Sequence, residues 1–384
     1  MKTLDVAVVP TLPIGIRGEV CSSAGLSLTP DAEPVTFWGL VEEWLKQLEG
    51  GKSGKRTKKA RTLETYRDAL KVFKKWLDAN GIDEPTRQDV IDWRAALETT
   101  KTKRNPNETL SVTTRNLYLT GVRVFYKWLA DEYGFDNITA GIEGWSDTKE
   151  HKRGFLSLDE MKALLAVVDT VTKQRLKDAE EKSMTICQVW TIALRGKRDK
   201  AILATLMAGG LRTIEISRLR IGDLSHDGGA CVLNVLGKGR DARETVKISR
   251  KAEQVIKEWL DVWESGRVLG KGDPLFCSLA NKSYGKPITS ASVSRLVKEY
   301  LQAAGLKVKE YTRGDAREVK PIVAHSLRGS CATNAFLAGA TLEQVKQQLR
   351  HRNLATTQIY LEEAEKSKNP VSDLISDGIF GEGN

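Results

Sequence analysis

Apolar side chains recur at helical spacing between residues 35 and 133, and this period excludes a β-sheet there. Three segments, 35–48, 62–79 and 112–133, carry a continuous apolar stripe on one helix face. The stripes consist of Phe37, Leu40, Val41, Trp44, Leu45 and Leu48; Leu63, Tyr66, Leu70, Phe73 and Leu77; and Leu119, Val122, Phe125, Tyr126 and Leu129. With a shorter helix over 87–98, they predict a four-helix module whose aromatic residues pack in a core rather than form a stacking surface.

The second half of the chain combines helices with a short β-hairpin. Residues 230–236 (ACVLNVL) and 244–248 (ETVKI) are typical of strands and flank a turn that contains Lys238. The densely charged segment 173–183 is predicted to be an exposed helical insertion. Further helices are predicted over 250–265, 289–304, 326–338, 341–350 and 353–363. The predicted fold class is therefore mainly α with a small β-sheet.

Two folded domains with tails fit a length of 384 residues, because one domain commonly holds about 100–200. Ser157 and Glu160 form a capping box that opens a helix after a polar stretch ending in HKRG. The predicted segments are an N-terminal arm 1–33, a helical domain 34–146, a linker 147–153, an α+β domain 154–365 and a tail 366–384. The apolar spacing of the tail fits docking on a neighbouring subunit, although a frayed end fits nearly as well.

Charge and cysteine usage narrow the classes of protein. The 60 Lys and Arg exceed the 50 Asp and Glu, and the net charge of +10 favours a polyanionic partner. The 5 cysteines are far apart without a CxxC pair, so no metal site or disulfide framework is predicted and a reducing cytoplasm is expected. No apolar run approaches the roughly 18 residues of a membrane span, and the first residues match a secretory signal poorly.

A run of basic residues without acids lies between the first two predicted helices. It contains Lys52, Lys55, Arg56, Lys58, Lys59 and Arg61. A solvated flexible loop and a loop that follows phosphates fit this run equally well. Arg115 and Arg123, in the predicted helix over 112–133, are further candidates for contact with a polyanion.

Six polar residues that can act on a phosphate follow one another through the second domain. They are Arg212, Lys238, His325, Arg328, His351 and Tyr360. The first lies at the start of an apolar helix and the second at the hairpin turn, while His325 and Arg328 are one helical turn apart and share a face. Taken singly, each has an ordinary structural explanation such as an ion pair or half-buried packing.

In combination, these residues resemble the tyrosine recombinase, or phage integrase, family. The resemblance covers residues 35–365 and rests on GLRTIEISRL, LGKGRDARETVKIS and AHSLRGSCATNAFLAGATLEQVKQQLRHRNLATTQIY. In this family the motifs supply an Arg, a Lys, a His/Arg pair, a His and a nucleophilic Tyr, in the order of the six residues above. Glu215 matches the acidic residue that commonly follows the first Arg and orients it.

The family resemblance also implies an architecture and partners. The helical domain is expected to be a core-binding domain that forms a C-shaped clamp around double-stranded DNA with the α+β catalytic domain. The expected activity is site-specific recombination, for integration, excision or resolution, by a homo-tetramer on paired sites. No cofactor is implied, and an accessory directionality factor is a candidate partner. The expected location is the cytoplasm of a bacterial host, at the nucleoid, as part of a mobile genetic element.

The chemistry of a phosphodiester accounts for these residue types. Its transition state gathers charge on two non-bridging oxygens, which two guanidiniums can hold bidentately while His351 donates a further hydrogen bond. A free tyrosine has a pKa of about 10, so either neighbouring positive charge must lower the pKa of Tyr360 or a base must take its proton. His325 is the candidate for that base or for proton balance. Lys238 is the candidate general acid for the leaving 5′ oxygen. Fixed positive charge then makes a metal unnecessary.

This sequence departs from the family at three places. Arg350 stands where the family usually has Gly, Gly329 stands where many relatives carry another His, and residues 1–33 are too short for a separate arm-site domain. Two other functions stay open: a type IB topoisomerase, which uses the same tyrosine chemistry as a monomer, and a non-catalytic DNA-binding protein on the same fold. Joined segments from two sites would exclude the first, and a covalent DNA adduct would exclude the second.

Overall fold

The computed structural model describes residues 36–51, 57–102, 105–146, 154–237, 242–265, 267–313, 316–351, 353 and 357–358; of residues 309–319 it describes the backbone alone. Contacts divide the chain into two compact units, with the division between Thr148 and Lys149. The predicted arm 1–33, linker 147–153 and tail 366–384 lie outside the described residues, as does most of the predicted helix 353–363.

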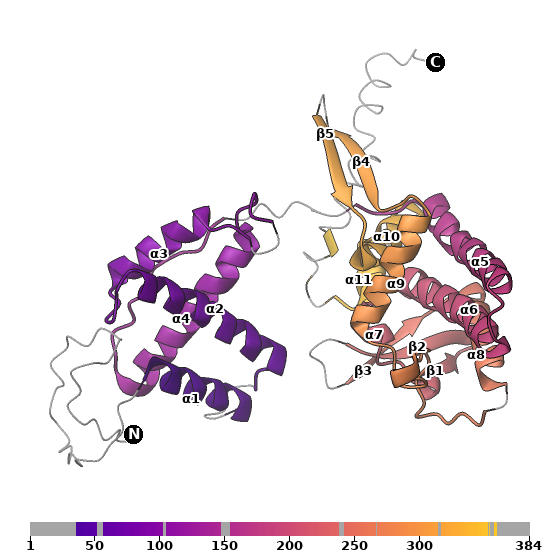
Figure 1. The fold of residues 1–384 in the computed structure, drawn as a ribbon, viewed down its shortest axis with the longest axis horizontal. Helices are drawn as coiled ribbons and strands as arrows, with labels where there is room; N and C mark the ends of the chain where they lie inside the picture. Colours follow the sequence, from indigo (N-terminus) through magenta and orange to yellow (C-terminus); the bar gives the residue numbers. More distant parts are fainter. Residues whose placement is uncertain are drawn as a thin grey trace, which may run out of the picture. The chain divides into compact units, whose positions relative to one another are not determined.

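The first unit consists of four helices, as the sequence predicts. They are α1 Phe37–Gly50, α2 Ala60–Ala79, α3 Arg87–Thr99 and α4 Val112–Tyr133 (Figure 1). The side chains of Thr36, Thr86 and Ser111 begin α1, α3 and α4 by accepting hydrogen bonds from backbone N–H groups of the first turn. Gly121 lets α4 lie close to α2, because a Cβ there would be 2.5 Å from the Cβ of Ala69.

The aromatic residues of the apolar stripes form the core of the first unit. The rings of Phe73 and Trp93 meet edge to face with centroids 4.8 Å apart, and Trp44 stacks on Tyr66 at 5.4 Å. Tyr126 is fully buried, and burial raises the pKa of its hydroxyl. Each large side chain buried in this way contributes about 1.5–3 kcal/mol. The prediction of a packed aromatic core is confirmed.

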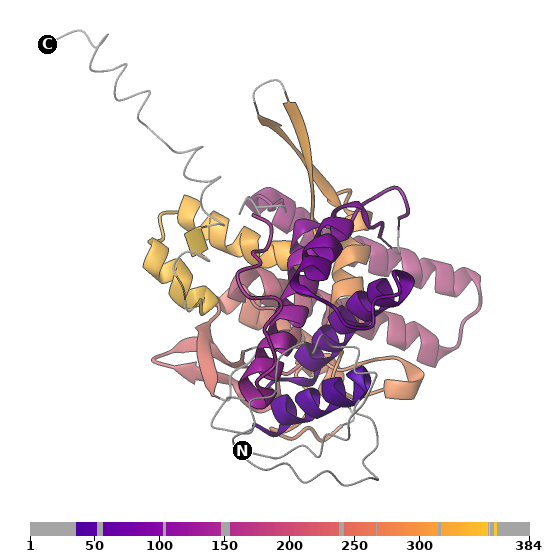
Figure 2. The same ribbon diagram turned by 90° about the vertical axis from the view of Figure 1, so that its left-hand side faces the viewer.

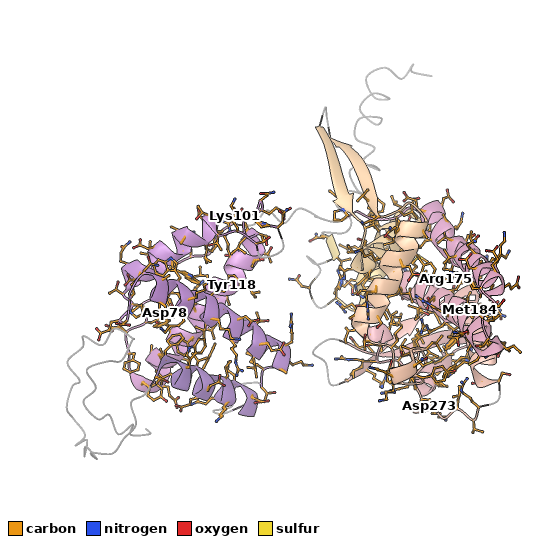
Figure 3. The ribbon with its side chains drawn as sticks, viewed as in Figure 1. Asp78, Lys101, Tyr118, Arg175, Met184 and Asp273 are labelled. Carbon is orange, nitrogen blue, oxygen red and sulfur yellow. The ribbon has the colours of Figure 1, made fainter. Side chains whose placement is uncertain are left out.

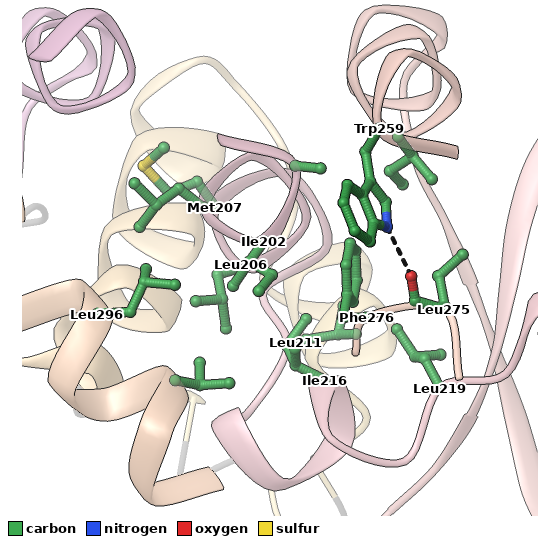
Figure 4. Close-up of a cluster of buried hydrophobic side chains, with 14 of the residues drawn as sticks. Ile202, Leu206, Met207, Leu211, Ile216, Leu219, Trp259, Leu275, Phe276 and Leu296 are labelled. Atoms are coloured by element: carbon green, nitrogen blue, oxygen red, sulfur yellow. Dashed lines mark hydrogen bonds between the residues drawn. The ribbon is translucent and has the colours of Figure 1, made fainter. Parts of the chain in front are cut away.

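The second unit surrounds a central helix with other helices and a small sheet. Its helices are α5 Leu158–Glu181, α6 Ile186–Gly209, α7 Thr213–Ile216, α8 Arg250–Glu264, α9 Ser290–Ala303, α10 Ala324–Leu337 and α11 Leu342–Leu349, with short 3-10 turns η2 Ile221–Asp223 and η3 Asn281–Ser283. The central helix α6 packs against α5, α8 and α10. Trp259 of α8 is buried against Phe276 and donates its indole N–H to the carbonyl of Leu275 at 2.8 Å (Figure 4).

The strands form two antiparallel groups. A three-stranded sheet has the order β1-β2-β3, with β1 Leu224–Asp227, β2 Ala230–Leu236 and β3 Arg243–Lys247. A separate hairpin of β4 Val308–Arg313 and β5 Ala316–Pro321 projects from the helices of its unit in both views (Figures 1 and 2). The predicted hairpin corresponds to β2 and β3, while β1, β4 and β5 were not predicted.

The prediction of an exposed helical insertion over 173–183 is confirmed for the helix up to Glu181 and for the exposure of most of its residues, but the segment is not a separate insertion. The segment is helical, but as far as Glu181 it continues α5 without a break, and its Ala179 is buried. Arg175 forms an ion pair with Glu299 of α9, so the charged face contacts the body of the unit (Figure 3). Charge alone suggested exposure, whereas ion pairing accounts for part of that charge. None of the helices in the described segments combines the length and apolarity that a membrane span requires.

Candidate active site

The ends of α6 and α11 meet where the first motif begins. Gly210 follows α6 with a left-handed backbone, φ 59° and ψ 32°. A Cβ at this position would lie 2.5 Å from Cδ2 of Leu349, at the end of α11, so a side chain here would displace Leu349 as well as strain the left-handed backbone. The chain then reaches Arg212, which is the residue that precedes α7.

Glu215 lies beneath Arg212 and is fully buried. Its Oε1 accepts a hydrogen bond from Nη1 of Arg212 at 2.9 Å, and its Oε2 accepts one from the Arg212 backbone N–H at 2.8 Å. Oε2 also accepts a hydrogen bond from Nη2 of Arg350 at 2.7 Å. Burial by itself would raise the pKa of Glu215, but Arg350, Arg212 and Arg328 together hold it below its ordinary value. Glu215 is therefore an ionised group that fixes two guanidiniums.

Arg328 joins three segments at the same place. It lies on α10 and is 0% exposed, whereas the Arg212 side chain is 30% exposed. Its guanidinium donates from Nη1 to the carbonyl of Gly210 and from Nη2 to the carbonyl of Leu349. Arg328 is thus held rigidly between the end of α6 and the end of α11.

His351 follows Arg350, the residue that ends α11, and is buried beside these guanidiniums. Its Nδ1 lies 2.9 Å from Oγ1 of Thr357. Burial and the positive charges of Arg328 and Arg212 lower the pKa of His351 to about 3, so its imidazole is neutral at physiological pH. His325, half-buried one turn before Arg328 on α10, is close enough to contribute to this shift.

The structure thus brings together four of the six predicted residues, with Glu215. Lys238 and Tyr360 lie outside the described residues. The strands that flank Lys238 remain paired up to Leu236 and Arg243. Sequence reasoning missed Thr357, which nothing in the sequence distinguishes from its neighbour Thr356.

Comparisons with known proteins decide the family. Residues 155–367, more than half of the chain, match the model of the phage integrase family, and residues 41–133 match that of the phage integrase N-terminal SAM-like domain. The chain belongs to the phage integrase family.

The relatives within this family are recombinases. Tyrosine recombinase XerC of Xylella fastidiosa is 28% identical over 301 residues, which are 78% of this chain and 85% of the relative. A post-cleavage complex of the XerH site-specific recombinase with a palindromic difH substrate has a TM-score of 0.60 at 18% identity and covers 86% of this chain and 83% of that one. A lambda integrase tetramer bound to a Holliday junction has a TM-score of 0.53 at 18% identity, with 83% and 76% covered. The chain is a DNA-binding tyrosine recombinase, an enzyme of site-specific recombination.

The basic residues predicted to contact DNA differ in their exposure to solvent and in their partners. Lys58 and Lys59 are exposed at the start of α2, and Arg61 forms an exposed ion pair with Glu64 at 3.0 Å. Arg123 is exposed, whereas Arg115 is half-buried with its guanidinium 5.1 Å from the ring of Trp145. Lys52, Lys55 and Arg56 lie outside the described residues.

One group of metal-binding residue types gathers away from the guanidiniums. Ligand atoms of His226, Cys231 and Glu253 lie within 4.8 Å of one another. The Glu253 carboxylate, however, accepts hydrogen bonds from Nζ of Lys257 at 2.6 Å and contacts the His226 ring at 2.9 Å. Burial, and then the Glu253 charge, raise the pKa of Cys231 to about 11, so its thiol stays protonated. In this structure Glu253 forms an ion pair with Lys257 beside His226 and Cys231.

Proposed function

We propose that the second unit cleaves DNA by transesterification, with Tyr360 as the nucleophile. The observation that carries this proposal is the convergence of Arg212, Arg328 and His351 from three segments far apart in the sequence. The Tyr360 oxygen attacks the scissile phosphorus, the bond to the 5′ oxygen breaks, and a 3′-phosphotyrosine forms. The 5′ hydroxyl of another strand reverses the step, so that no ATP is consumed.

Each group in the proposed site has one task. Arg212, held by Glu215 and partly exposed, donates hydrogen bonds to a non-bridging oxygen. Arg328 was expected to hold the second oxygen, but it is 0% exposed and donates both Nη groups to backbone carbonyls, so it supplies fixed positive charge instead. When the Thr357 hydroxyl donates to Nδ1 of the neutral His351, the proton of that imidazole lies on Nε2 and can be donated to the phosphate. His325 accepts the proton of Tyr360, and Lys238 donates one to the leaving 5′ oxygen.

We also propose the assembly in which this chemistry operates. Residues 34–146 form the core-binding domain, 147–153 the linker and 154–365 the catalytic domain, and the two domains enclose duplex DNA as a C-shaped clamp. Four copies act on paired recombination sites, which the lambda integrase tetramer on a Holliday junction supports. The setting is a mobile genetic element at the bacterial nucleoid, in the cytoplasm, with an accessory factor that sets direction.

A nicked duplex that carries the native site tests the proposal. After cleavage the short fragment beyond the nick diffuses away, so a covalent protein–DNA adduct is expected to accumulate and survive denaturation. With two intact sites, segments from both are expected to be joined. Relaxed circles alone would show a topoisomerase, and the lack of any adduct would show a non-catalytic DNA-binding protein.

Removing the charges of the basic loop is expected to weaken binding to all DNA sequences alike. Replacing Lys55, Arg56, Lys58 and Lys59 with Ala should reduce the slope of log affinity against log salt by about 0.9 for each phosphate that the loop no longer neutralises. The control replaces Lys71 and Lys74 with Ala. These two lysines form ion pairs with acids of the same helix α2, so the slope of log affinity against log salt should stay unchanged. If the four-residue variant kept the wild-type slope of log affinity against log salt, the basic residues between α1 and α2 would be a solvated loop without phosphate contacts.

Deleting residues 371–384 is expected to spare binding to one site but reduce cooperative binding to paired sites. The described part of the second unit has an apolar groove of about 510 Å³, lined by Met161, Met207 and Val255, that suits apolar side chains from a neighbouring tail. Each side chain seated there would contribute about 1.5–3 kcal/mol. Replacing Leu374, Ile375 and Phe380 with Ser keeps the tail length and should reproduce the loss. Full cooperativity in both variants would show a frayed end.

A further inference from the structure

Arg350 occupies a backbone position that glycine normally fills. Its φ of 56° and ψ of 44° are left-handed, and among the described residues the only other non-glycine residue with positive φ is Ser183. Two hydrogen bonds close the end of α11 around it, from the Arg350 N–H to the Gln347 carbonyl at 3.0 Å and from the His351 N–H to the Lys346 carbonyl at 3.1 Å. A residue with a Cβ is less stable than glycine in this left-handed conformation. We therefore expect an interaction that offsets this cost among the contacts of the Arg350 side chain.

The side chain of Arg350 points into the protein rather than toward a ligand. It is 3% exposed, against 30% for Arg212. Nη2 donates to Oε2 of Glu215 at 2.7 Å, and Nη1 donates to the carbonyl of Gln348 at 3.2 Å. A guanidinium buried in this way does not reach a DNA phosphate at the surface. Its hydrogen bond to Glu215 links it to Arg212, and its charge also acts on the neighbouring His351.

Glu215 is the group that Arg350 shares with Arg212. Oε1 accepts a hydrogen bond from the Arg212 guanidinium, while Oε2 accepts hydrogen bonds from the Arg212 backbone N–H and from Arg350. A buried carboxylate with Arg212 as its only close partner would cancel much of the charge that Arg212 offers to a phosphate. Arg350 offsets part of the negative charge of Glu215 from inside the protein. The positive potential of Arg212 at the phosphate is then less reduced by Glu215.

We propose that Arg350 is a positioning residue of the cleavage site, which keeps Glu215 ionised and fixed so that Arg212 is oriented and fully charged toward the scissile phosphate. This inference rests on the proposed function, in which Arg212 binds that phosphate. Arg350 contributes the largest of the charge interactions that lower the pKa of Glu215. Without it, burial would move the pKa of Glu215 upward.

The test is the pH dependence of covalent-adduct formation on the nicked substrate. Arg350→Gly relieves the left-handed backbone but removes the charge, Arg350→Asn tolerates the same backbone without a charge, and Arg350→Lys keeps the charge. In the Gly and Asn variants the acid limb of the rate profile is expected to move up by about one pH unit or more. Their rate at neutral pH should fall by about 10–100-fold, as when outer partners of ligand-holding groups are removed. The Lys variant should keep the acid limb near that of the wild type.

Glu215→Gln supplies the matched background, because its side chain cannot ionise. In this background Arg350→Gly should produce no further shift of the acid limb. Wild-type rates and pH profiles in the Gly and Asn variants would overturn the inference. A reduced salt slope of DNA binding with an unchanged pH profile would also overturn it and show a direct phosphate contact. Failure of the wild type itself to form an adduct would refute the proposed function instead. Thermal unfolding identifies any variant that is misfolded, and the remaining variants still decide the question.

Discussion

Replacing Tyr360 with phenylalanine is expected to abolish the covalent DNA adduct while DNA binding persists. The substitution removes only the hydroxyl oxygen proposed to attack phosphorus, and it leaves in place Arg212 and His351, which are proposed to contact the phosphate, and the buried charge of Arg328. Other enzymes that lose their nucleophile slow on the order of 10⁶-fold, so no adduct should be detectable. Denaturing electrophoresis of the nicked-substrate reaction measures the adduct, and a mobility shift measures binding.

Tyr284→Phe is the matched control for this experiment. Tyr284 is an exposed tyrosine of the same unit whose hydroxyl accepts a hydrogen bond from Arg267 at 2.6 Å. This variant should form the adduct at the wild-type rate. If Tyr360→Phe still trapped DNA, the assignment of the nucleophile would be wrong.

Replacing Lys238 with alanine is expected to slow cleavage by about 10²–10⁴-fold, the usual contribution of a general acid. The leaving 5′ oxygen would then depart without a proton. A substrate with sulfur at the bridging 5′ position releases a thiolate that needs no proton, so it should restore the rate of the variant. Rates of adduct formation with the two substrates measure this rescue.

Lys247→Ala serves as the control, because Lys247 is an exposed lysine in β3 of the same sheet. It should lower neither rate strongly. A Lys238→Ala variant that remained equally slow with both substrates would assign Lys238 to binding rather than to proton transfer.

The helices of the first unit could be predicted because burial imposes the period of the apolar residues. Phe73 and Phe125 lie on such stripes and are themselves completely buried. The hairpin of β4 and β5 could not be predicted, because VKEYTR and AREVKP lack the alternation of apolar and polar residues that marks a half-buried strand.

The order of the six polar residues predicted which side chains to look for, but not how they are held. The contact between Glu215 and Arg350 joins residues 135 apart in the chain, so it depends on where the end of α11 lies beside α7. The residues near Glu215 or Arg350 in the sequence do not determine that placement. The contact of His351 with Thr357 was missed for a different reason, because nothing in the sequence distinguishes Thr357 from Thr356.

The hydrogen bonds of Arg328 have a consequence during synthesis. A chain leaves the ribosome from its N-terminus, so Gly210 and Arg212 emerge long before Arg328, and Leu349 emerges later still. Because Arg328 donates to the carbonyls of both Gly210 and Leu349, a chain that has not yet reached Leu349 cannot fix Arg328 between these two segments. Tyr360 is added after all of them. Under the proposed mechanism, a nascent molecule therefore cannot cleave DNA until the chain from Gly210 to Tyr360 has been synthesised.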